Sequence, residues 1–299
     1  MKKLTLFFVF GFAFVIALLV VSTGEARALD ENSCLSCHGT EGFSKTNQAG
    51  QTVSLYVDVS KVNVSAHRYI DCTTCHSDDP HNVATPLTKL SLAEKCGTCH
   101  EYEYKLHLQS IHGQQLALGN PDVATCVDCH SPDPNPHSVI RTLEYNAPAY
   151  KKNIADTCAV CHNDEALMVD YGIVEKVYES YLRSFHGKAI DLGTYEPGAL
   201  DEATCTNCHG SHDVKSVTDP GSPVAGMANL AVTCEQCHTG AGSQFAAGFL
   251  GHREASSDNI APVHYTEIIF RIILISVIAF GAIVVVTAIV RFSINRWRK

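Results

Sequence analysis

Positive charge is scarce in this sequence. Its 299 residues include 22 Lys and Arg against 31 Asp and Glu, a formal net charge of −9 at pH 7. Removal of a leader ending at Ala28 would leave 19 basic residues (22 − 3) and 30 acidic residues (31 − 1), so −11. Nucleic-acid-binding proteins neutralise phosphates with clustered Lys and Arg. The composition therefore argues against a nucleic-acid partner.

Signals for β-structure are also few. The best strand-like stretch is Gln51–Val64, where apolar residues alternate at Val53, Leu55, Val57 and Val59. Sandwiches and barrels need many such strands separated by turn signals. The sequence therefore predicts a mostly α-helical and irregular fold.

No cysteine lies outside one short motif. All 14 cysteines belong to seven copies of Cys-x-x-Cys-His, which we call motifs 1 to 7 in chain order. They are Cys34/Cys37/His38, Cys72/Cys75/His76, Cys96/Cys99/His100, Cys126/Cys129/His130, Cys158/Cys161/His162, Cys205/Cys208/His209 and Cys234/Cys237/His238. Two thiols at this spacing can form thioethers to the vinyl groups of one haem, and the adjoining histidine is then its proximal iron ligand. The motifs predict seven covalently bound c-type haems.

Two other uses of cysteine compete with this interpretation. Structural zinc needs paired Cys-x-x-Cys knuckles that converge on one ion, and it does not require a histidine directly after each second cysteine. Disulfides are common in exported chains with an even number of cysteines. Neither accounts for seven histidines placed identically, so haem is the favoured interpretation.

Methionine is scarce, whereas histidine is plentiful. After removal of the leader only Met168 and Met227 remain, so axial ligation by a thioether is at most a minor pattern. The chain has 16 histidines, and nine of them lie outside the motifs. Nine spare imidazoles suffice to give each of seven irons a second histidine. Bis-histidine ligation lacks the thioether that raises the potential, so we expect low-potential haems.

An internal repeat organises these histidines. Motifs 1, 3 and 5 begin 62 residues apart, at Cys34, Cys96 and Cys158. We define the first segment as residues 34–91, the second as 96–140, the third as 158–215 and the last as 234–265. Each of the first three segments carries two motifs, a Ser-x-His element between them and one histidine shortly after the second motif.

The recurring spare histidines are the predicted distal iron ligands. Six occupy matching places in the three segments: His67, His81, His112, His137, His186 and His212. For motif 7 the candidates are His252 and His264. His107 lies five residues before His112 and breaks the pattern. The sequence leaves open which distal histidine serves which iron.

The spacing of the motifs also constrains the core. Leu29 to Thr266 gives 238 residues for seven haems, or 34 residues for each. This is too little protein for separate haem-binding domains, so stacked haems are expected to form the core, surrounded by loops and short helices. We expect helices at Leu92–Tyr104 and Asp164–Ser184.

The N-terminus resembles a secretory signal peptide. Met1-Lys2-Lys3 precedes an apolar run from Leu4 to Val21, and an Ala-x-Ala site ends at Ala28. These features predict a signal peptide over residues 1–28 and an exported domain over 29–266. An uncleaved N-terminal anchor is the alternative, because the apolar run is long for a signal.

A second apolar run lies near the C-terminus. Ile272 to Val290 contains 19 residues (290 − 272 + 1) without a charge, about the length needed to cross a bilayer. A basic tail follows, with Arg291, Arg296, Arg298 and Lys299. Positive residues favour the cytoplasmic side. We expect a transmembrane helix over residues 267–291 and a cytoplasmic tail over 292–299, with the haem domain on the periplasmic side of the inner membrane.

These motifs resemble those of the cytochrome c3-like multihaem cytochromes and of the NapC/NirT/NrfH group. The resemblance rests on Ser110–Gly113 (S-I-H-G), Ser184–Gly187 (S-F-H-G) and Cys205–His212 (C-T-N-C-H-G-S-H). It implies electron transfer between membrane quinol and periplasmic or extracellular acceptors in anaerobic respiration. Proteins of that group are anchored at the N-terminus and carry fewer haems, so their quinol site does not transfer by position.

Electron transfer is the function that these features predict. The expected partners are the cytoplasmic membrane, menaquinol or an integral membrane subunit that oxidises quinol, and periplasmic cytochromes or a terminal reductase. A role as an electron carrier is favoured over an enzyme, although a quinol dehydrogenase subunit is compatible with it. Two alternatives are a multihaem oxidoreductase of the nitrite or hydroxylamine type, which needs an open iron position, and a subunit of an extracellular cytochrome filament.

Overall fold

Short helices surround the cysteine motifs in the computed structural model. It describes residues 33–47, 50–76, 81, 88–173, 176–192, 202–249, 251–253, 256, 258 and 261–298. Four motifs lie within helices: α2 (Ser33–His38), α8 (Cys126–His130), α9 (Ile154–His162) and α13 (Cys205–His209). Both thiols of motif 2 lie on α4 (Cys72–Cys75), and motifs 3 and 7 begin near the ends of α5 (Lys89–Gly97) and α14 (Gly226–Glu235). The expectation of helices around the motifs is confirmed.

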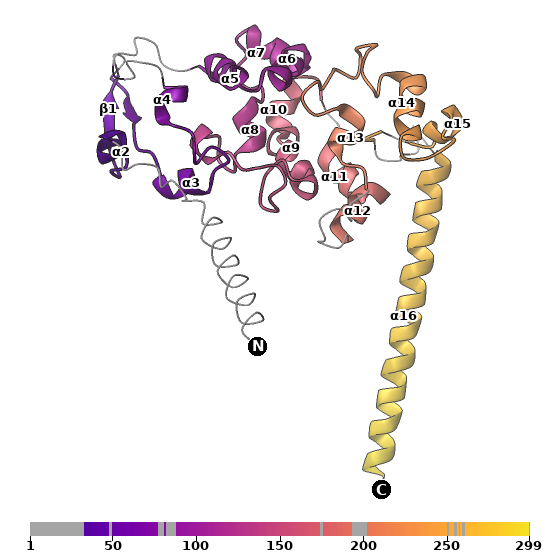
Figure 1. The fold of residues 1–299 in the computed structure, drawn as a ribbon. Helices are drawn as coiled ribbons and strands as arrows, with labels where there is room; N and C mark the ends of the chain where they lie inside the picture. Colours follow the sequence, from indigo (N-terminus) through magenta and orange to yellow (C-terminus); the bar gives the residue numbers. More distant parts are fainter. Residues whose placement is uncertain are drawn as a thin grey trace, which may run out of the picture. The chain divides into compact units, whose positions relative to one another are not determined.

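The chain divides into two compact units, residues 1–153 and 154–299. The first unit also contains β1 (Ser44–Thr46), β2 (Thr52–Ser54), α3 (Val59–Val64), α6 (Glu101–Gln109), α7 (Ile111–Ala117), η1 (Pro136–Ser138) and η2 (Lys151–Asn153). The second also contains α10 (Glu165–Asp170), α11 (Val177–Arg183), α12 (Phe185–Leu192), α15 (Ser243–Ala246) and α16 (Ala261–Trp297). The elements are labelled in Figure 1. The predicted mostly α and irregular fold is confirmed.

The predicted strand is shorter than the sequence pattern. Strand β2 pairs antiparallel with β1, with Lys45 opposite Val53, and these two strands form a single small sheet in the described part of the chain. The predicted strand Gln51–Val64 is wrong beyond Ser54, where β2 ends, because helix α3 begins after Asp58. The Asp58 carboxylate accepts a hydrogen bond from the Ser60 N–H at 2.9 Å, which satisfies a free donor at the start of α3.

The two predicted helices are each interrupted. Leu92–Tyr104 splits between α5 and α6, because His100 leaves the helical region with φ −102° and ψ 52°. Asp164–Ser184 splits after α10, where Gly172 has a φ of +71°. This left-handed conformation suits glycine and ends a helix.

The polypeptide core of the first unit is small. Ala93, Leu116 and Val123 are buried together, with Leu90 and Tyr104 packed against them. This cluster joins α5, α6 and α7. Elsewhere Val127, Met168 and Ile190 are buried singly, and the largest side chains that are fully buried in the described chain are all serines: Ser65, Ser110 and Ser222.

Helix α9 is central to the packing of the second unit. It contacts α10, α11 and α13, while α11 contacts α12 and α14 contacts α15. A polar contact reinforces one of these pairs: the Tyr178 hydroxyl on α11 donates to the Asp156 carboxylate on α9. The Thr233 hydroxyl on α14 donates to the Pro223 carbonyl at 2.7 Å.

The last helix, α16, is long and apolar. Figure 1 shows it in yellow as one continuous helix, and its 37 residues correspond to about 55 Å at 1.5 Å per residue. Within it the Ser276 and Thr287 hydroxyls donate to the carbonyls of Ile272 and Ile283, so they need no external partner. In length and composition α16 can cross a membrane. The predicted signal peptide, residues 1–28, lies outside the described residues.

Candidate functional site

A buried serine fixes the turn before His112. Ser110 is 2% exposed. Its hydroxyl donates to the His107 carbonyl and accepts the Gly113 N–H at 2.9 Å, so it caps α7. A Cβ on Gly113 would lie 1.9 Å from the His107 carbonyl oxygen, which leaves no room for another residue. The Ser-x-His-Gly pattern is thus a helix start that presents its histidine on the first turn.

The same turn recurs at His186 in the third segment. The Ser184 hydroxyl donates to the Tyr181 carbonyl and accepts the Gly187 N–H at 3.1 Å. A Cβ on Gly187 would lie 2.2 Å from the Tyr181 carbonyl oxygen.

In the first segment the corresponding serine is Ser65, which is 1% exposed and accepts the His67 N–H at 3.1 Å. All three Ser-x-His elements therefore begin from a serine that bonds to the backbone of the following turn. The sequence repeat is also a structural repeat.

Motifs 4 and 6 share a different cap. The Thr125 N–H and hydroxyl both donate to the Asp128 carboxylate, at 2.7 and 2.8 Å. The Thr204 N–H and hydroxyl donate to the Asn207 amide oxygen at 2.8 and 2.9 Å. In each case the cap holds the first turn of the helix that carries the two cysteines and the histidine.

Histidine rings are paired in the first unit. Each pair joins one motif histidine to one histidine outside the motifs. The centroid distances and angles between ring planes are 6.3 Å and 24° for His38–His81, 6.0 Å and 25° for His76–His137, and 6.2 Å and 43° for His100–His67. Three predicted distal histidines thus lie opposite three predicted proximal ones.

Two further pairs occur in the second unit. His209 and His252 are 6.1 Å apart with planes at 20°, and His238 and His186 are 6.1 Å apart at 40°. We expected His252 or His264 to face motif 7. His252 instead faces motif 6, and motif 7 faces His186. The sequence contained the recurring positions but no signal for this pairing.

Hydrogen bonds orient two of these rings. The Nδ1–H of His38 donates to the Leu55 carbonyl at 2.8 Å, since a carbonyl only accepts. Nδ1 of His252 and the Ser180 hydroxyl are 2.9 Å apart. A metal-binding histidine usually bonds through one nitrogen and ligates through the other. In both rings the nitrogen that makes this bond is Nδ1, so Nε2 would be the nitrogen that ligates a metal.

Burial favours the neutral form of several of these imidazoles. It lowers the pKa of His67, His137, His186 and His209, and the paired ring adds to the effect in each case. The pKa of His162 is lowered by burial and then by His252. Neutral imidazole is the form that binds a metal.

The remaining candidate histidines are half-buried. His107 lies on α6, His112 on α7, His130 at the end of α8, His212 in the turn after α13 and His264 on α16. His264 and the adjacent Tyr265 have ring centroids 5.5 Å apart.

The motif cysteines lie at or near the surface of the polypeptide. None of the fourteen forms a disulfide, and none is fully buried. Among the second cysteines of the motifs, Cys37 on α2 and Cys129 on α8 are exposed, whereas Cys161 on α9 is half-buried. The sequence predicted that the core would lie at these motifs. The side chains that the polypeptide itself buries lie mostly beside them, so the predicted thioether positions remain accessible to a bound group.

Thiols of successive motifs are close together in the first unit. A hydrogen-bonding contact with Cys126 holds the pKa of Cys96 at about 7. Burial raises the pKa of Cys72, and nearby Cys34 adds to this. Burial likewise raises the pKa of Cys75, with contributions from Cys96 and Cys99 of motif 3. In space, motifs 1 to 4 therefore follow one another in the same order as in the chain.

Motifs 5 to 7 follow the same order in the second unit. A hydrogen-bonding contact with Cys158 lowers the pKa of Cys205. Burial raises the pKa of Cys208, and Cys234 and Cys237 of motif 7 add to this. Across the described residues, no set of three or more Cys, His, Asp or Glu side chains converges as ligands for a metal ion.

Comparison with known proteins gives a distant relationship. The chain is 25% identical over 234 residues to the multiheme cytochrome MtrA of Shewanella baltica (strain OS185). The alignment covers 69% of this chain and 66% of MtrA, slightly less than two thirds of that protein. No family model matches the chain, and no solved structure matches it. The sequence is thus similar to that of a multiheme cytochrome.

Proposed function

We propose that this chain is a membrane-anchored c-type cytochrome that binds seven haems and transfers electrons. The five histidine pairs carry the proposal. A metal–imidazole bond of about 2.0 Å puts a ring centroid about 3 Å from the metal, so two rings on opposite sides of one iron lie about 6 Å apart. The five centroid distances, 6.0 to 6.3 Å, fit an iron between the rings.

The surroundings also suit a large apolar group. Phe185, directly before His186, is 94% exposed, and Val160, inside motif 5, is 77% exposed. Exposed apolar side chains are buried favourably by a partner with apolar surface, at about 25 cal/mol per Å². The two thiols of each motif, such as Cys158 and Cys161, would form the thioether bonds to the vinyl groups at the edge of the haem. Seven haems would use all fourteen cysteines without remainder.

The residues around each iron favour electron transfer over substrate chemistry. A bound haem supplies one-electron redox chemistry. In the five pairs, two imidazoles would hold each iron from opposite sides and would leave no open position for a substrate. Histidine on both sides, without methionine, keeps the potential low. The proximity of thiols from successive motifs is compatible with electron transfer among motifs 1 to 4 in one unit and among motifs 5 to 7 in the other.

The similarity to a multiheme cytochrome supports this function. We place the chain near the NapC/NirT/NrfH group and propose export through a signal peptide cleaved after Ala28. Helix α16 would anchor it in the inner membrane, with residues 292–299 in the cytoplasm. The donor would be menaquinol, through an integral membrane partner, because a single span makes a poor quinol pocket. The acceptors would be periplasmic cytochromes or a terminal reductase in anaerobic respiration.

Carbon monoxide binding tests the proposed function. The reduced protein should bind it poorly, since the proposal gives each of the seven irons two histidines, and redox titration should show predominantly low potentials. A multihaem oxidoreductase would bind carbon monoxide at an open iron. Fast stoichiometric binding at one haem, or a titration dominated by high potentials, would contradict the proposal.

A further inference from the structure

In the first unit the paired rings come from different segments. The first segment contains motif 2 and His67, and the second contains motif 3 and His137. His67 faces His100 of motif 3, while His137 faces His76 of motif 2. Each segment therefore places one histidine opposite a motif of the other. Motif 1 has no preceding segment, and its His38 faces His81 of its own segment.

The second unit repeats this reciprocal arrangement. The third segment contains motif 6 and His186, and the last contains motif 7 and His252. His186 faces His238 of motif 7, and His252 faces His209 of motif 6. In both units the histidine of the Ser-x-His element (His67 or His186) faces a motif of the next segment. The other exchanged histidine (His137 or His252) faces a motif of the preceding segment.

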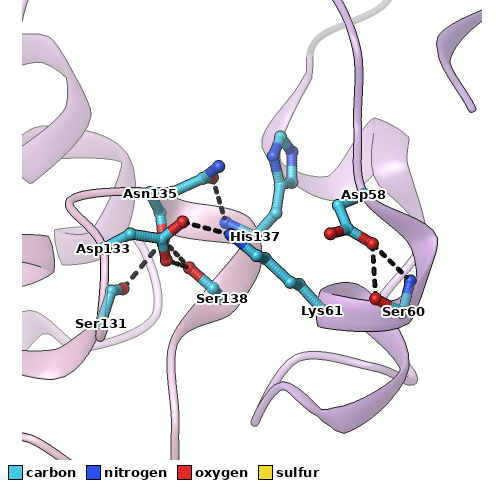
Figure 2. A network of polar contacts seen from close by, with 8 residues as sticks. All are labelled: Asp58, Ser60, Lys61, Ser131, Asp133, Asn135, His137 and Ser138. Carbon is cyan, nitrogen blue, oxygen red and sulfur yellow. Dashed lines mark hydrogen bonds and ion pairs between the residues drawn. The ribbon is translucent and has the colours of Figure 1, made fainter. Parts of the chain in front are cut away.

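Polar contacts brace the segments that carry the two exchanged histidines of the first unit, and Figure 2 shows those around His137. The Lys61 ammonium on α3 bonds to the Asp133 carboxylate at 2.7 Å, and Asp133 also accepts from Ser138. The Asn135 side chain accepts the His137 N–H at 2.9 Å. The loop that carries His137 is thereby tied to the helix that leads to His67.

A backbone bond completes this brace. The Ala66 N–H, next to His67, donates to the Val139 carbonyl at 2.7 Å, two residues after His137. Neither histidine can move far without disturbing the other.

The second unit contains a corresponding brace with different residues. Ser180 lies on α11, the helix that leads to His186, and its hydroxyl bonds to Nδ1 of His252 at 2.9 Å. In each unit, the helix before the Ser-x-His element holds the segment that carries the other exchanged histidine. Two unrelated contacts at equivalent places argue that the exchange is built into the fold.

We propose that consecutive segments exchange axial ligands, so that His67 and His100 share one iron, His137 and His76 a second, His186 and His238 a third, and His252 and His209 a fourth. This rests on the proposed function. Each of these haems is then attached to one segment and ligated by its neighbour. The exchange makes folding of one segment depend on haem insertion in the next.

Paired histidine substitutions test which two rings share an iron. Loss of one axial histidine opens one iron to carbon monoxide. If both substituted histidines ligate the same iron, only one iron becomes able to bind carbon monoxide. If they ligate different irons, two irons do. Thioether attachment keeps the haem in place in either case. The number of carbon monoxide molecules bound per reduced chain therefore reports the pairing.

For the full-length haem-loaded protein, we expect His67→Ala with His100→Ala to bind one carbon monoxide. The crossed control, His67→Ala with His76→Ala, should bind two. Two carbon monoxide molecules with the first variant, or one with the control, would overturn the exchange.

The second unit provides an independent test if these variants do not fold. His186→Ala with His238→Ala should bind one carbon monoxide, and His186→Ala with His209→Ala should bind two. The reverse counts would overturn the exchange. The unsubstituted protein separates the two proposals: seven haems with poor carbon monoxide binding support the proposed function, so wrong counts in the variants then refute the exchange alone. Fewer haems, or carbon monoxide binding without any substitution, would refute the proposed function itself.

Discussion

A charge placed at the centre of α16 tests whether this helix anchors the protein. The run from Ile272 to Val290 contains 13 Ile, Leu, Val or Phe residues, each favouring insertion by about 0.3–0.6 kcal/mol, or about 4–8 kcal/mol together. One arginine at the helix centre costs about 2.5–3.5 kcal/mol. Two arginines would therefore offset most of the driving force, whereas one would not.

Gly281 is the site for the first arginine. It lies midway between Ile272 and Val290, and a Cβ there meets no atom within 4 Å, so the substitution introduces charge without a clash. Ile278 is three residues away on the same helical face and provides the second site. Ile294→Arg, beyond the apolar run on the same helix, is the matched control.

Membrane fractionation after cell breakage measures the outcome. We expect Gly281→Arg to remain mostly in the membrane fraction, and the double variant with Ile278→Arg to become largely soluble. Intact mass establishes whether the released chain begins at Leu29, because a retained leader would itself act as an anchor. A double variant that begins at Leu29 and pellets as completely as Ile294→Arg would refute the role of α16.

Three further predictions concern the segments around the histidines. Gly113→Ala should sharply reduce holoprotein yield, since its Cβ would lie 1.9 Å from a backbone oxygen, whereas Gly242→Ala, with open space around it, should not. Ser180→Ala removes one hydrogen bond to His252, worth about 1 kcal/mol. The apparent affinity of carbon monoxide for the iron that His252 would ligate should therefore rise about fivefold. The pKa of Asp133 is lowered by its bonds to lysine and Ser138, so its stabilising effect is present near neutral pH and is lost as pH falls through the folded pKa. Thermal unfolding of Asp133→Asn should depend less on pH below about 4; an unchanged acid profile would contradict this.

Local patterns were the most predictable part of this protein. Cys-x-x-Cys-His spacing places the cysteines and histidine on or beside one helical turn, and the structure has helices at or next to all seven motifs. The Ser-x-His-Gly pattern is equally local, because the serine cap and the close approach at glycine lie within one turn. The apolar run of α16 is visible from composition alone.

Long-range relationships were not predictable. The alternation from Val53 to Val59 favoured a strand, but the Asp58 cap started a helix, so a local hydrogen bond overrode hydrophobic periodicity. The partner of His252 depends on how the last segment packs against α11, where Ser180 holds its ring. No spacing rule in the sequence contains that contact. Recurrence identified four of the five histidines that pair with a motif histidine, all except His252, and only tertiary structure identified their partners.

Covalent haem content is the measurement that tests the central claim most directly. The alkaline pyridine haemochrome spectrum of the purified full-length protein, normalised to polypeptide by amino-acid analysis, counts thioether-linked haems. The account predicts seven c-type haems per chain, one for each pair of cysteines. A count far below seven, or haem extractable by acid acetone, would contradict it.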